Sequence, residues 1–414
     1  MSRQKKQSLG HSALNDLVVT DDCVQFCGQS LNRLAEAVGH TPFFAYDSNR
    51  MTQRVEALRA ALPKEVHLHY AMKANPMPAV VNHMAGLVDG LDVASGNELT
   101  VALASGTDPR TISFAGPGKR EAELAAAIDA GITINMESSG EMETIARLAA
   151  EKGIRAPVAV RVNPDFQLKT SGMKMGGGPQ QFGVDAEVVP EMLAQLAKLP
   201  LDFAGFHIYC GSQNLRAEAI CEAQAKTLEL ALELAAHAPC TPRILNIGGG
   251  FGIPYFPGET PLDLEPIGEQ LARLVPGVMT AMPGVELVIE LGRYLVGEAG
   301  IYVCQVIDRK VSRGSVFLVT DGGLHHHLAA SGNFGQVIRK NYPVVIGNKV
   351  TGSARETASV VGPLCTPLDL LADRMDLAEA QPGDLVVVLQ SGAYGPTASP
   401  SAFLSHPPAG EYFA

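Results

Sequence analysis

The chain has 414 residues, of which 46% are hydrophobic and 18% charged, and its formal net charge is −11. This length predicts two domains, and the composition is typical of a compact water-soluble protein. The negative charge argues against nucleic acid as a partner. No apolar run approaches the ~18 residues of a membrane span, no secretory signal is recognisable, and seven cysteines are an odd number for a disulfide framework. We therefore expect a cytoplasmic protein with no membrane partner.

The N-terminal residues 1–40 contain one strand-like stretch, LVVTDDCVQFCGQSL, which we expect to join a β-domain formed mainly by the C-terminal part of the chain. Strands and helices then alternate. Eight β-rich segments are predicted, at 66–73, 87–95, 111–117, 132–137, 157–164, 202–210, 244–250 and 286–292. Helical periodicity lies between them, at 119–130, 138–152, 185–199, 217–237 and 262–282.

Eight strands that alternate with helices over about 230 residues predict the α/β class and a (β/α)8 TIM barrel over residues 41–292. A doubly wound open sheet is the alternative, but the polar and glycine residues gather at the strand C-termini, where barrel enzymes keep their chemistry. From 293 to 414 short apolar stretches separated by turns predict an all-β domain. The polar, glycine-rich region 166–184 is predicted to be a mobile loop over the barrel mouth.

Residues that could take part in catalysis or ligand binding stand at the ends of these strands. Lys73 ends the first one, and a partly desolvated lysine there can form an imine with a carbonyl, although it could also be a solvated loop residue. The stretch NIGGGFG at 246–252 offers backbone N–H groups to a phosphate, although glycines also permit tight turns. Glu290 and Arg293 end the last barrel strand, either as site residues or as a buried ion pair.

Other polar residues end the remaining strands. His207 is either a ring that stacks on a ligand or a core histidine, and Asp92, Arg161 and Asn163 occupy similar positions. An imine-forming lysine, a phosphate cradle, a carboxylate and a flat ring on one face fit the cofactor pyridoxal 5′-phosphate, because its aldehyde, phosphate, pyridine nitrogen and ring face each need one such partner.

The combined motifs resemble those of the fold-type III pyridoxal-phosphate decarboxylases, the family of diaminopimelate, ornithine and arginine decarboxylases. HYAMKANP is similar to the family's Schiff-base lysine motif, GLDVASGNEL to its second-strand motif and GGGFG to its phosphate loop. ELGR is similar to the family's Glu-Pro-Gly-Arg, with Leu291 in place of proline. GPLCTPLD and GAYG resemble its cysteine and tyrosine motifs. The resemblance covers nearly the whole chain, from Phe43 to FLSHP at 403–407.

The resemblance implies an amino-acid decarboxylase that forms a Schiff base at Lys73, releases carbon dioxide via a quinonoid and reprotonates the α-carbon. Glu290 would keep the pyridine nitrogen protonated, His207 would stack on the ring, and Cys365 would donate the proton unless it is a buried structural thiol. A homodimer with shared active sites is also implied. The remaining implied cofactor contacts are Asp92, Ser212, Gly248, Gly249, Gly250, Arg293 and Tyr394. Two additional residues between His207 and Ser212, relative to the family's His-x-Gly-Ser, weaken the assignment of Ser212.

The implied substrate contacts are Arg161, Arg293, Thr366, Asp369 (or a helix cap at that position) and Tyr394. Two residues that would recognise a charge at the distal end of the substrate are missing. Thr366 follows the motif cysteine, where diaminopimelate enzymes carry Glu and ornithine enzymes Asp, and Ala329 stands where an Arg would grip a distal carboxylate. The substrate is therefore expected to be an amino acid without a free distal charge. The same combination resembles the carrier-protein-linked and exosortase-A-associated branch of the family, so an amino acid bound to an acyl carrier protein is a candidate.

Other functions remain open. They are a diaminopimelate decarboxylase that makes L-lysine, a non-catalytic decarboxylase paralogue that binds partners, and an amino-acid racemase, which Glu290 disfavours. The run His325, His326 and His327 would place its middle side chain opposite the other two in a strand, so we expect no metal site there. A polar lining of the substrate pocket is the preferred interpretation.

Overall fold

The computed structural model describes residues 10–414 except 167–172, 175, 337 and 353. The chain divides into two compact units. One, the barrel unit, comprises residues 52–252 and 262–295, and the other, the β-rich unit, comprises residues 1–51, 253–261 and 296–414. The N-terminal segment of the β-rich unit ends at residue 51 and not at 40, and the barrel unit ends at residue 295 and not at 292. The short segment 253–261 was not expected in the β-rich unit. None of the described helices has the length and apolarity needed to cross a lipid bilayer.

The barrel unit is a closed ring of eight parallel strands, which confirms the predicted (β/α)8 fold. Ring closure follows from the pairing of β15 with β5 and of β8 with β9. In the order in which they neighbour one another, the strands are β5 (Val66–Ala71), β6 (Gly90–Val93), β7 (Ile112–Phe114), β8 (Thr133–Met136), β9 (Ala156–Asn163), β12 (Leu201–Ile208), β14 (Ile244–Gly249) and β15 (Glu286–Leu291).

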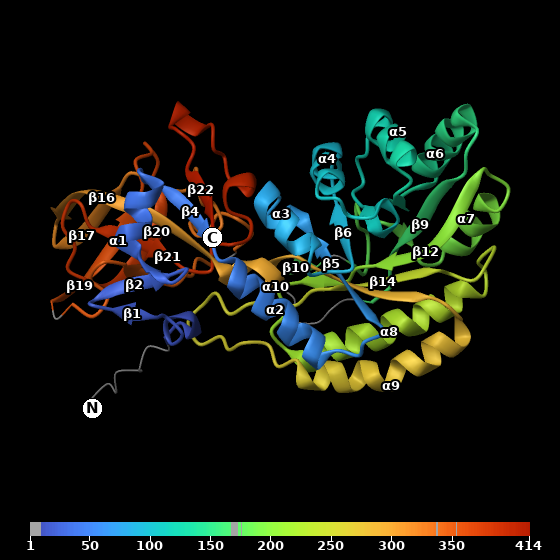
Figure 1. Ribbon diagram of the computed structural model, residues 1–414, viewed down its shortest axis with the longest axis horizontal. Helices are drawn as coiled ribbons and strands as arrows, with labels where there is room; N and C mark the ends of the chain where they lie inside the picture. Colours follow the sequence, from blue (N-terminus) through green and yellow to red (C-terminus); the bar gives the residue numbers. More distant parts are fainter. Residues whose placement is uncertain (1–9, 167–172, 175, 337, 353) are drawn as a thin grey trace. The chain divides into compact units, whose positions relative to one another are not determined.

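Helices lie outside this ring of strands (Figure 1). They are α2 (Ser48–Ala61), whose first turn belongs to the β-rich unit, α3 (Pro78–Ala85), α4 (Gly96–Ala104), α5 (Glu121–Ala130), α6 (Ser139–Lys152), α7 (Val189–Leu196), α8 (Ala217–Ala235) and α9 (Glu265–Ala281).

Two of these helices begin with the same short sequence signal just after a strand. Ser95 accepts a hydrogen bond from the Glu98 N–H at the start of α4, and Ser138 accepts one from the Glu141 N–H at the start of α6. In both cases the glutamate reaches back to a backbone N–H before the cap. This reciprocal pattern fixes where the helix begins, and with it the loop that leaves the strand.

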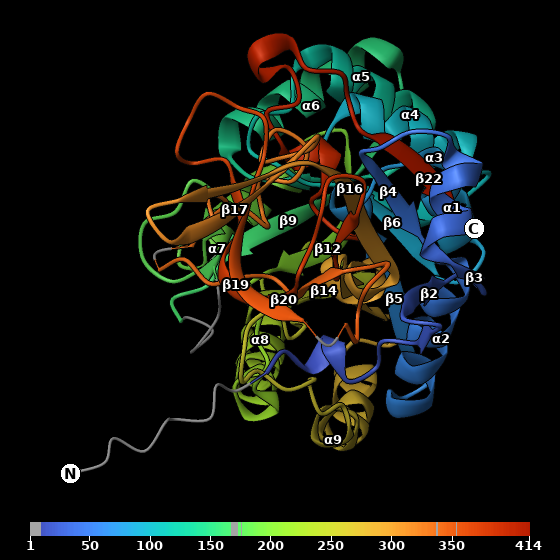
Figure 2. The same ribbon diagram turned by 90° about the vertical axis from the view of Figure 1, so that its left-hand side faces the viewer.

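The β-rich unit contains an eight-stranded sheet of mixed direction, as expected for the C-terminal part of the chain. Figure 2 shows its strands β16 and β17, which pair as an antiparallel hairpin. The strands are β4 (Phe43–Tyr46), β16 (Gly300–Ser312), β17 (Ser315–Thr320), β18 (Val344–Ile346), β19 (Arg355–Val361), β20 (Leu370–Ala378), β21 (Leu385–Val388) and β22 (Gly410–Phe413).

The N-terminal stretch forms its own small sheet and does not extend the larger one. It contains β1 (Val19–Thr20), β2 (Cys23–Phe26) and β3 (Gln29–Ser30), followed by α1 (Leu31–Val38). Short strands broken by turns at Asp21 and Cys27, both with positive φ, cannot supply a long edge for pairing. Apolar side chains of β2 and α1 instead pack in one buried cluster with residues of β4, β16 and β21.

The predicted loop at 166–184 coincides only partly with described residues. Residues 167–172 and 175 lie outside them. Within the described part, β10 (Met173–Lys174) pairs with β13 (Gly211–Ser212), and β11 (Val184–Asp185) pairs in parallel with β9. Two pieces of this region are therefore held by backbone hydrogen bonds to barrel-unit strands.

Candidate active site

A layer of polar side chains occupies the barrel, with one residue from each strand. Barrel interiors are usually filled by branched aliphatic side chains, so a polar layer marks a functional region. Seven of these residues are buried and one, Ser113, is half-buried. In strand order they are His69, Asp92, Ser113, Asn135, Arg161, His207, Asn246 and Glu290.

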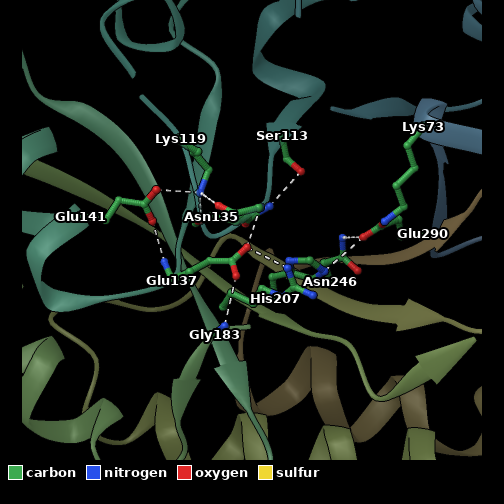
Figure 3. Close-up of polar contacts among 12 residues, drawn as sticks. Lys73, Ser113, Lys119, Asn135, Glu137, Glu141, Gly183, His207, Asn246 and Glu290 are labelled. Carbon is green, nitrogen blue, oxygen red and sulfur yellow. Dashed lines mark hydrogen bonds and ion pairs between the residues drawn. The ribbon is translucent and has the colours of Figure 1, made fainter. Parts of the chain in front are cut away.

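Glu290 is the centre of one half of this layer. Lys73 Nζ lies 3.7 Å from Glu290 Oε1, and His207 Nε2 lies 3.1 Å from Glu290 Oε2. Asn246 Nδ2 is 3.5 Å from the same Oε2. Figure 3 shows the four side chains pointing toward one another. The sequence therefore predicted three residues that the fold brings together, Lys73, His207 and Glu290.

The carboxylate of Glu290 is held in its charged form. Burial by itself would raise the pKa of Glu290, but His207, Lys73 and Arg161 together outweigh burial and lower the pKa below its usual range. A buried carboxylate that stays ionised can hold a proton on a neighbouring basic nitrogen, which is the role expected beside a pyridine ring.

Lys73 differs from the rest of the layer in being accessible. Its side chain is 46% exposed, whereas that of Glu290 is 6% exposed. The short helical turn Met72–Ala74 follows β5 directly and carries Lys73 beyond the strand end. The Lys73 ammonium also lies 5.8 Å from the centre of the Tyr209 ring. A ligand carbonyl can therefore reach the amine while the carboxylate beneath it stays buried.

The glycine loop, which we define as residues 248–250 at the C-terminal end of β14, leaves no room for side chains at Gly248 and Gly249. Gly248 has φ +67°, and a Cβ at this position would lie 2.7 Å from Tyr209 Cδ2. A Cβ at Gly249 would lie 2.3 Å from the carbonyl oxygen of Glu290. Asn246 Oδ1 accepts a hydrogen bond from the Gly248 N–H at 2.8 Å and so fixes the turn. Only glycine fits here, which supports the predicted role of a backbone cradle.

Several buried polar atoms in this region have no hydrogen-bond partner among the described residues. They include Ser212 Oγ, Asp92 Oδ2 and both ring nitrogens of His207. His207 Nε2 is near Glu290 but not in hydrogen-bond geometry. Buried polar groups are normally paired, and exceptions concentrate where a ligand completes the pairing. Together with the accessible lysine and the glycine cradle, these atoms fit pyridoxal 5′-phosphate.

The other half of the layer contains a pairing that the sequence did not predict. Arg161 donates a hydrogen bond to Glu137 Oε1 at 2.7 Å, and its guanidinium lies 5.0 Å from the centre of the Phe182 ring. The same carboxylate accepts the N–H groups of Gly116 and Gly183. Arg161 is thus tied into the loops at the barrel end, and its predicted substrate contact stays a prediction. Glu137 follows β8 directly, which is the signal that could have identified it.

The remaining predicted site residues lie near the end of the barrel unit or in the β-rich unit. Arg293 is half-buried at the start of α10 (Arg293–Val296). In the β-rich unit Cys365 is exposed, Thr366 and Tyr394 are half-buried, and Tyr394 has φ +53°. An exposed Cys365 thiol does not match the alternative of a buried structural cysteine.

Asp369 is buried, and both of its carboxylate oxygens accept hydrogen bonds from backbone N–H groups. Its Oδ1 accepts the Leu324 N–H at 2.6 Å and its Oδ2 accepts the Leu364 N–H at 2.8 Å. These bonds join the cysteine motif to the segment that carries the three histidines. They give Asp369 a structural role within the β-rich unit, and a contact between Asp369 and substrate stays a prediction.

The three histidines are all buried and are held differently. His327 Nε2 lies 2.9 Å from Ser391 Oγ, and His326 Nε2 lies 2.8 Å from the Pro407 carbonyl oxygen. The ring of His325 is tilted by 42° against that of His326 with ring centres 3.7 Å apart, and neither of its nitrogens has a partner among the described residues. No group of histidine, cysteine and carboxylate side chains suited to a metal ion occurs within the described residues.

Comparison with known proteins identifies the family. Residues 48–297 match the family described as pyridoxal-dependent decarboxylase, pyridoxal binding domain. The L-glutamyl-[BtrI acyl-carrier protein] decarboxylase of Niallia circulans is 38% identical over 373 residues, which is 89% of this chain and 87% of that protein. The diaminopimelate decarboxylase of Aquifex aeolicus is 34% identical over 371 residues, or 89% of this chain and 85% of that protein.

A solved structure extends the similarity to the whole fold. Diaminopimelate decarboxylase from Helicobacter pylori, complexed with L-lysine, superposes with a TM-score of 0.81 at 29% identity and covers 92% of this chain and 94% of its own. The chain therefore belongs to the fold-type III pyridoxal-phosphate-dependent decarboxylases, and its cofactor is pyridoxal 5′-phosphate.

Proposed function

We propose that the protein decarboxylates an α-amino acid whose distal end is a thioester on an acyl carrier protein. The observation that carries this proposal is the replacement of both distal-charge readers: Thr366 follows the motif cysteine, and the buried Ala329 stands where an arginine is expected. Neither side chain can neutralise a charged group. Because discrimination between substrates needs a buried polar or charged partner, a free diamino acid is poorly matched to this site.

One relative supports the same substrate class. The 38% identical protein of Niallia circulans is named for a glutamyl group carried on a protein. Other relatives at 30 to 34% identity are named diaminopimelate decarboxylases, so turnover of free diaminopimelate to L-lysine is the second candidate. The presence of Lys73, Glu290 and Cys365 argues against a non-catalytic paralogue.

Different residues of the barrel unit would hold different parts of the cofactor. Lys73 would hold the aldehyde carbon, Glu290 the pyridine nitrogen and His207 the ring face. The glycines at 248–250, Ser212 and Arg293 would hold the phosphate, and Asp92 would add a polar contact. Tyr394 from the β-rich unit is a further phosphate ligand by family resemblance. When bound, pyridoxal phosphate supplies an electron sink for the charge left on the α-carbon by loss of carbon dioxide.

The chain's own groups then set the direction of the reaction. Glu290, ionised and buried, would keep a proton on the pyridine nitrogen of the bound cofactor and so strengthen the electron sink. The burial of the polar layer beneath Lys73 would keep this electrostatic interaction strong. Cys365, which is exposed in the β-rich unit, is the proposed proton donor to the α-carbon, and the shared homodimeric site remains part of the proposal.

Carbon dioxide release from paired substrates tests the proposal. Each amino acid, beginning with glutamate and diaminopimelate, is supplied free and as a thioester on a carrier protein. We expect release from a thioester and little from the same amino acid free. A carrier protein without its pantetheine arm, mixed with free amino acid, and the Lys73→Ala enzyme serve as controls. Efficient release from free diaminopimelate, with none from any thioester, would overturn the carrier proposal in favour of the lysine-forming reaction.

A further inference from the structure

His69 is a buried titratable residue in the polar layer that the proposed roles do not use. It lies on β5, four residues before Lys73, and pairs in register with Glu290 on β15. Its Nδ1 lies 3.2 Å from Asp92 Oδ1, and Ser113 Oγ donates to the same oxygen at 2.6 Å. Asn135 Nδ2 in turn donates to Ser113 Oγ at 3.0 Å. Four neighbouring strands thus contribute to one hydrogen-bonded chain.

Within this series of hydrogen bonds, the two carboxylate oxygens of Asp92 are paired unequally. Oδ1 has two partners, whereas Oδ2 has none among the described residues although Asp92 is only 5% exposed. An unpaired buried carboxylate oxygen is costly and is retained where a ligand completes it. His69 and Ser113 therefore hold the carboxylate by one oxygen, and the other oxygen is left for a bound group.

Backbone packing fixes the orientation of the His69 ring. A Cβ at Gly90 would lie 2.5 Å from Cε1 and Nε2 of His69 and 2.3 Å from the carbonyl oxygen of Thr111. The imidazole therefore lies against the backbone of β6, at a place that only glycine leaves open. The ring has little freedom to turn away from Asp92.

The surroundings of His69 favour its charged form. Burial opposes a charge, but the carboxylates of Asp92, Glu290 and Asp89 outweigh burial and raise the pKa of His69 above its usual value. The nearby cations, Lys73 and Arg161, act on Glu290. A cavity of about 20 Å³ beside the His69 ring has room for one water molecule to solvate it. Its polar lining residues are His69, Arg110, Thr111, Ser113, Thr133, Asn135 and Asn246.

We propose that His69 is a positioning residue for the cofactor: as an imidazolium it holds the Asp92 carboxylate through Oδ1 and offsets the two buried charges of Asp92 and Glu290. The inference rests on the proposed cofactor contacts of Asp92 and Glu290, and it does not depend on which amino acid is the substrate.

Two substitutions separate geometry from charge. His69→Asn keeps a side-chain N–H donor close to the position of Nδ1 and removes the charge, whereas His69→Phe removes both and keeps the ring volume. His67→Asn, on the same strand, is the matched control. The equilibrium dissociation constant of pyridoxal phosphate, measured from pH 6 to 9, is the readout, together with circular dichroism to verify folding.

We expect His69→Phe to weaken cofactor binding roughly tenfold at pH 7, since one charge-assisted hydrogen bond is lost. His69→Asn should keep part of the affinity but lose the pH dependence above 6.5 that wild type and His67→Asn share. In ¹³C-histidine-labelled apoenzyme, the resonance missing from His69→Asn should titrate above pH 6.5. That measurement does not depend on catalysis.

Wild-type affinity and an unchanged pH profile in His69→Phe would overturn the inference, as would a His69 resonance that titrates below pH 6.5. If the His69 variants bind normally while Glu290→Gln binds weakly, the inference fails and the proposed cofactor site stands. If Glu290→Gln also binds normally, the proposed cofactor contacts fail as well.

Discussion

At the scale of single residues, the site depends on one carboxylate that stays ionised in a buried position. Glu290 is buried beside Lys73, His207 and Asn246. Burial raises its pKa, but His207, Lys73 and Arg161 outweigh burial and lower it. A family decarboxylase needs a protonated pyridine nitrogen, and only an ionised partner holds that proton well. The charge of this one residue is therefore more important than its hydrogen bonds.

Replacing Glu290 with glutamine tests this charge. Glu290→Gln keeps the size and one acceptor oxygen but cannot hold a proton on the nitrogen, so we expect kcat to fall about 100-fold, a loss comparable to that of one preorganised electrostatic partner. Steady-state carbon dioxide release gives kcat. Glu286→Gln, at the exposed start of the same strand, is the control. Activity within a few-fold of wild type in Glu290→Gln would exclude the proposed role.

The sequence predicted Lys73, His207 and Glu290 because each stands at a strand end within a recognisable motif. It did not predict the pairs Arg161 with Glu137 or His69 with Asp92, whose members are 24 and 23 positions apart. Such pairs depend on the register of neighbouring strands. That register is set by closure of the barrel, and a single sequence does not encode it locally.

At the scale of elements, the glycine loop at the end of β14 is the part of the site that tolerates least change. Gly248 combines a left-handed backbone with a close approach to Tyr209. Gly284 also has a left-handed backbone, φ +80°, but a Cβ there would meet nothing within 4 Å. The two glycines therefore distinguish backbone strain from steric crowding.

Alanine substitution at these two positions gives a matched pair. Both changes should cost about 1 kcal/mol in the free energy of unfolding because alanine disfavours positive φ, and Gly248→Ala should cost more because its Cβ would also crowd Tyr209. Only Gly248→Ala should also weaken pyridoxal phosphate, by at least roughly tenfold, since its Cβ displaces the loop that would cradle the phosphate. Urea unfolding and cofactor titration measure the two quantities. Equal cofactor affinity in both variants would show that the loop does not hold the phosphate.

Element boundaries were predicted less well than element order. The second barrel strand, expected at 87–95, spans only Gly90–Val93, and β16 extends from Gly300 to Ser312 although 300–307 was expected. The first starts only at Gly90 because the Leu68 N–H is bound by the side-chain Oδ2 of Asp89 and not by a backbone carbonyl oxygen. The second is long because β17 forms a hairpin with its exposed half, which apolar content alone does not reveal.

At the scale of the whole molecule, acid stability should reflect the buried histidines of the β-rich unit. Burial lowers the pKa of His327 to about 3, and burial, with the neighbouring His326 and His406, lowers that of His325 to about 4. Unfolded histidine titrates near 6.5. Below that pH the unfolded chain binds protons that these two residues do not bind when folded, so stability is full above pH 6.5 and is lost as pH falls toward 4 and 3.

This linkage predicts a slope that can be measured. Each of the two histidines should lower the free energy of unfolding by up to about 1.4 kcal/mol per pH unit below 6.5. His325→Phe removes one titrating ring and keeps an aromatic ring beside His326, so its stability should fall less steeply between pH 6.5 and 5. His40→Gln, at an exposed position, is the control. Identical slopes in wild type and His325→Phe would contradict the prediction.

The most direct test of the central claim is to locate the lysine that binds the cofactor. The enzyme is reconstituted with pyridoxal phosphate, reduced with borohydride, digested and analysed by peptide mass spectrometry. We expect the pyridoxyl mass on the peptide that contains Lys73, and no stable attachment in Lys73→Ala. Attachment at a different lysine, or none in the wild-type protein after full reconstitution, would contradict the assignment of Lys73 and of the site built around Glu290.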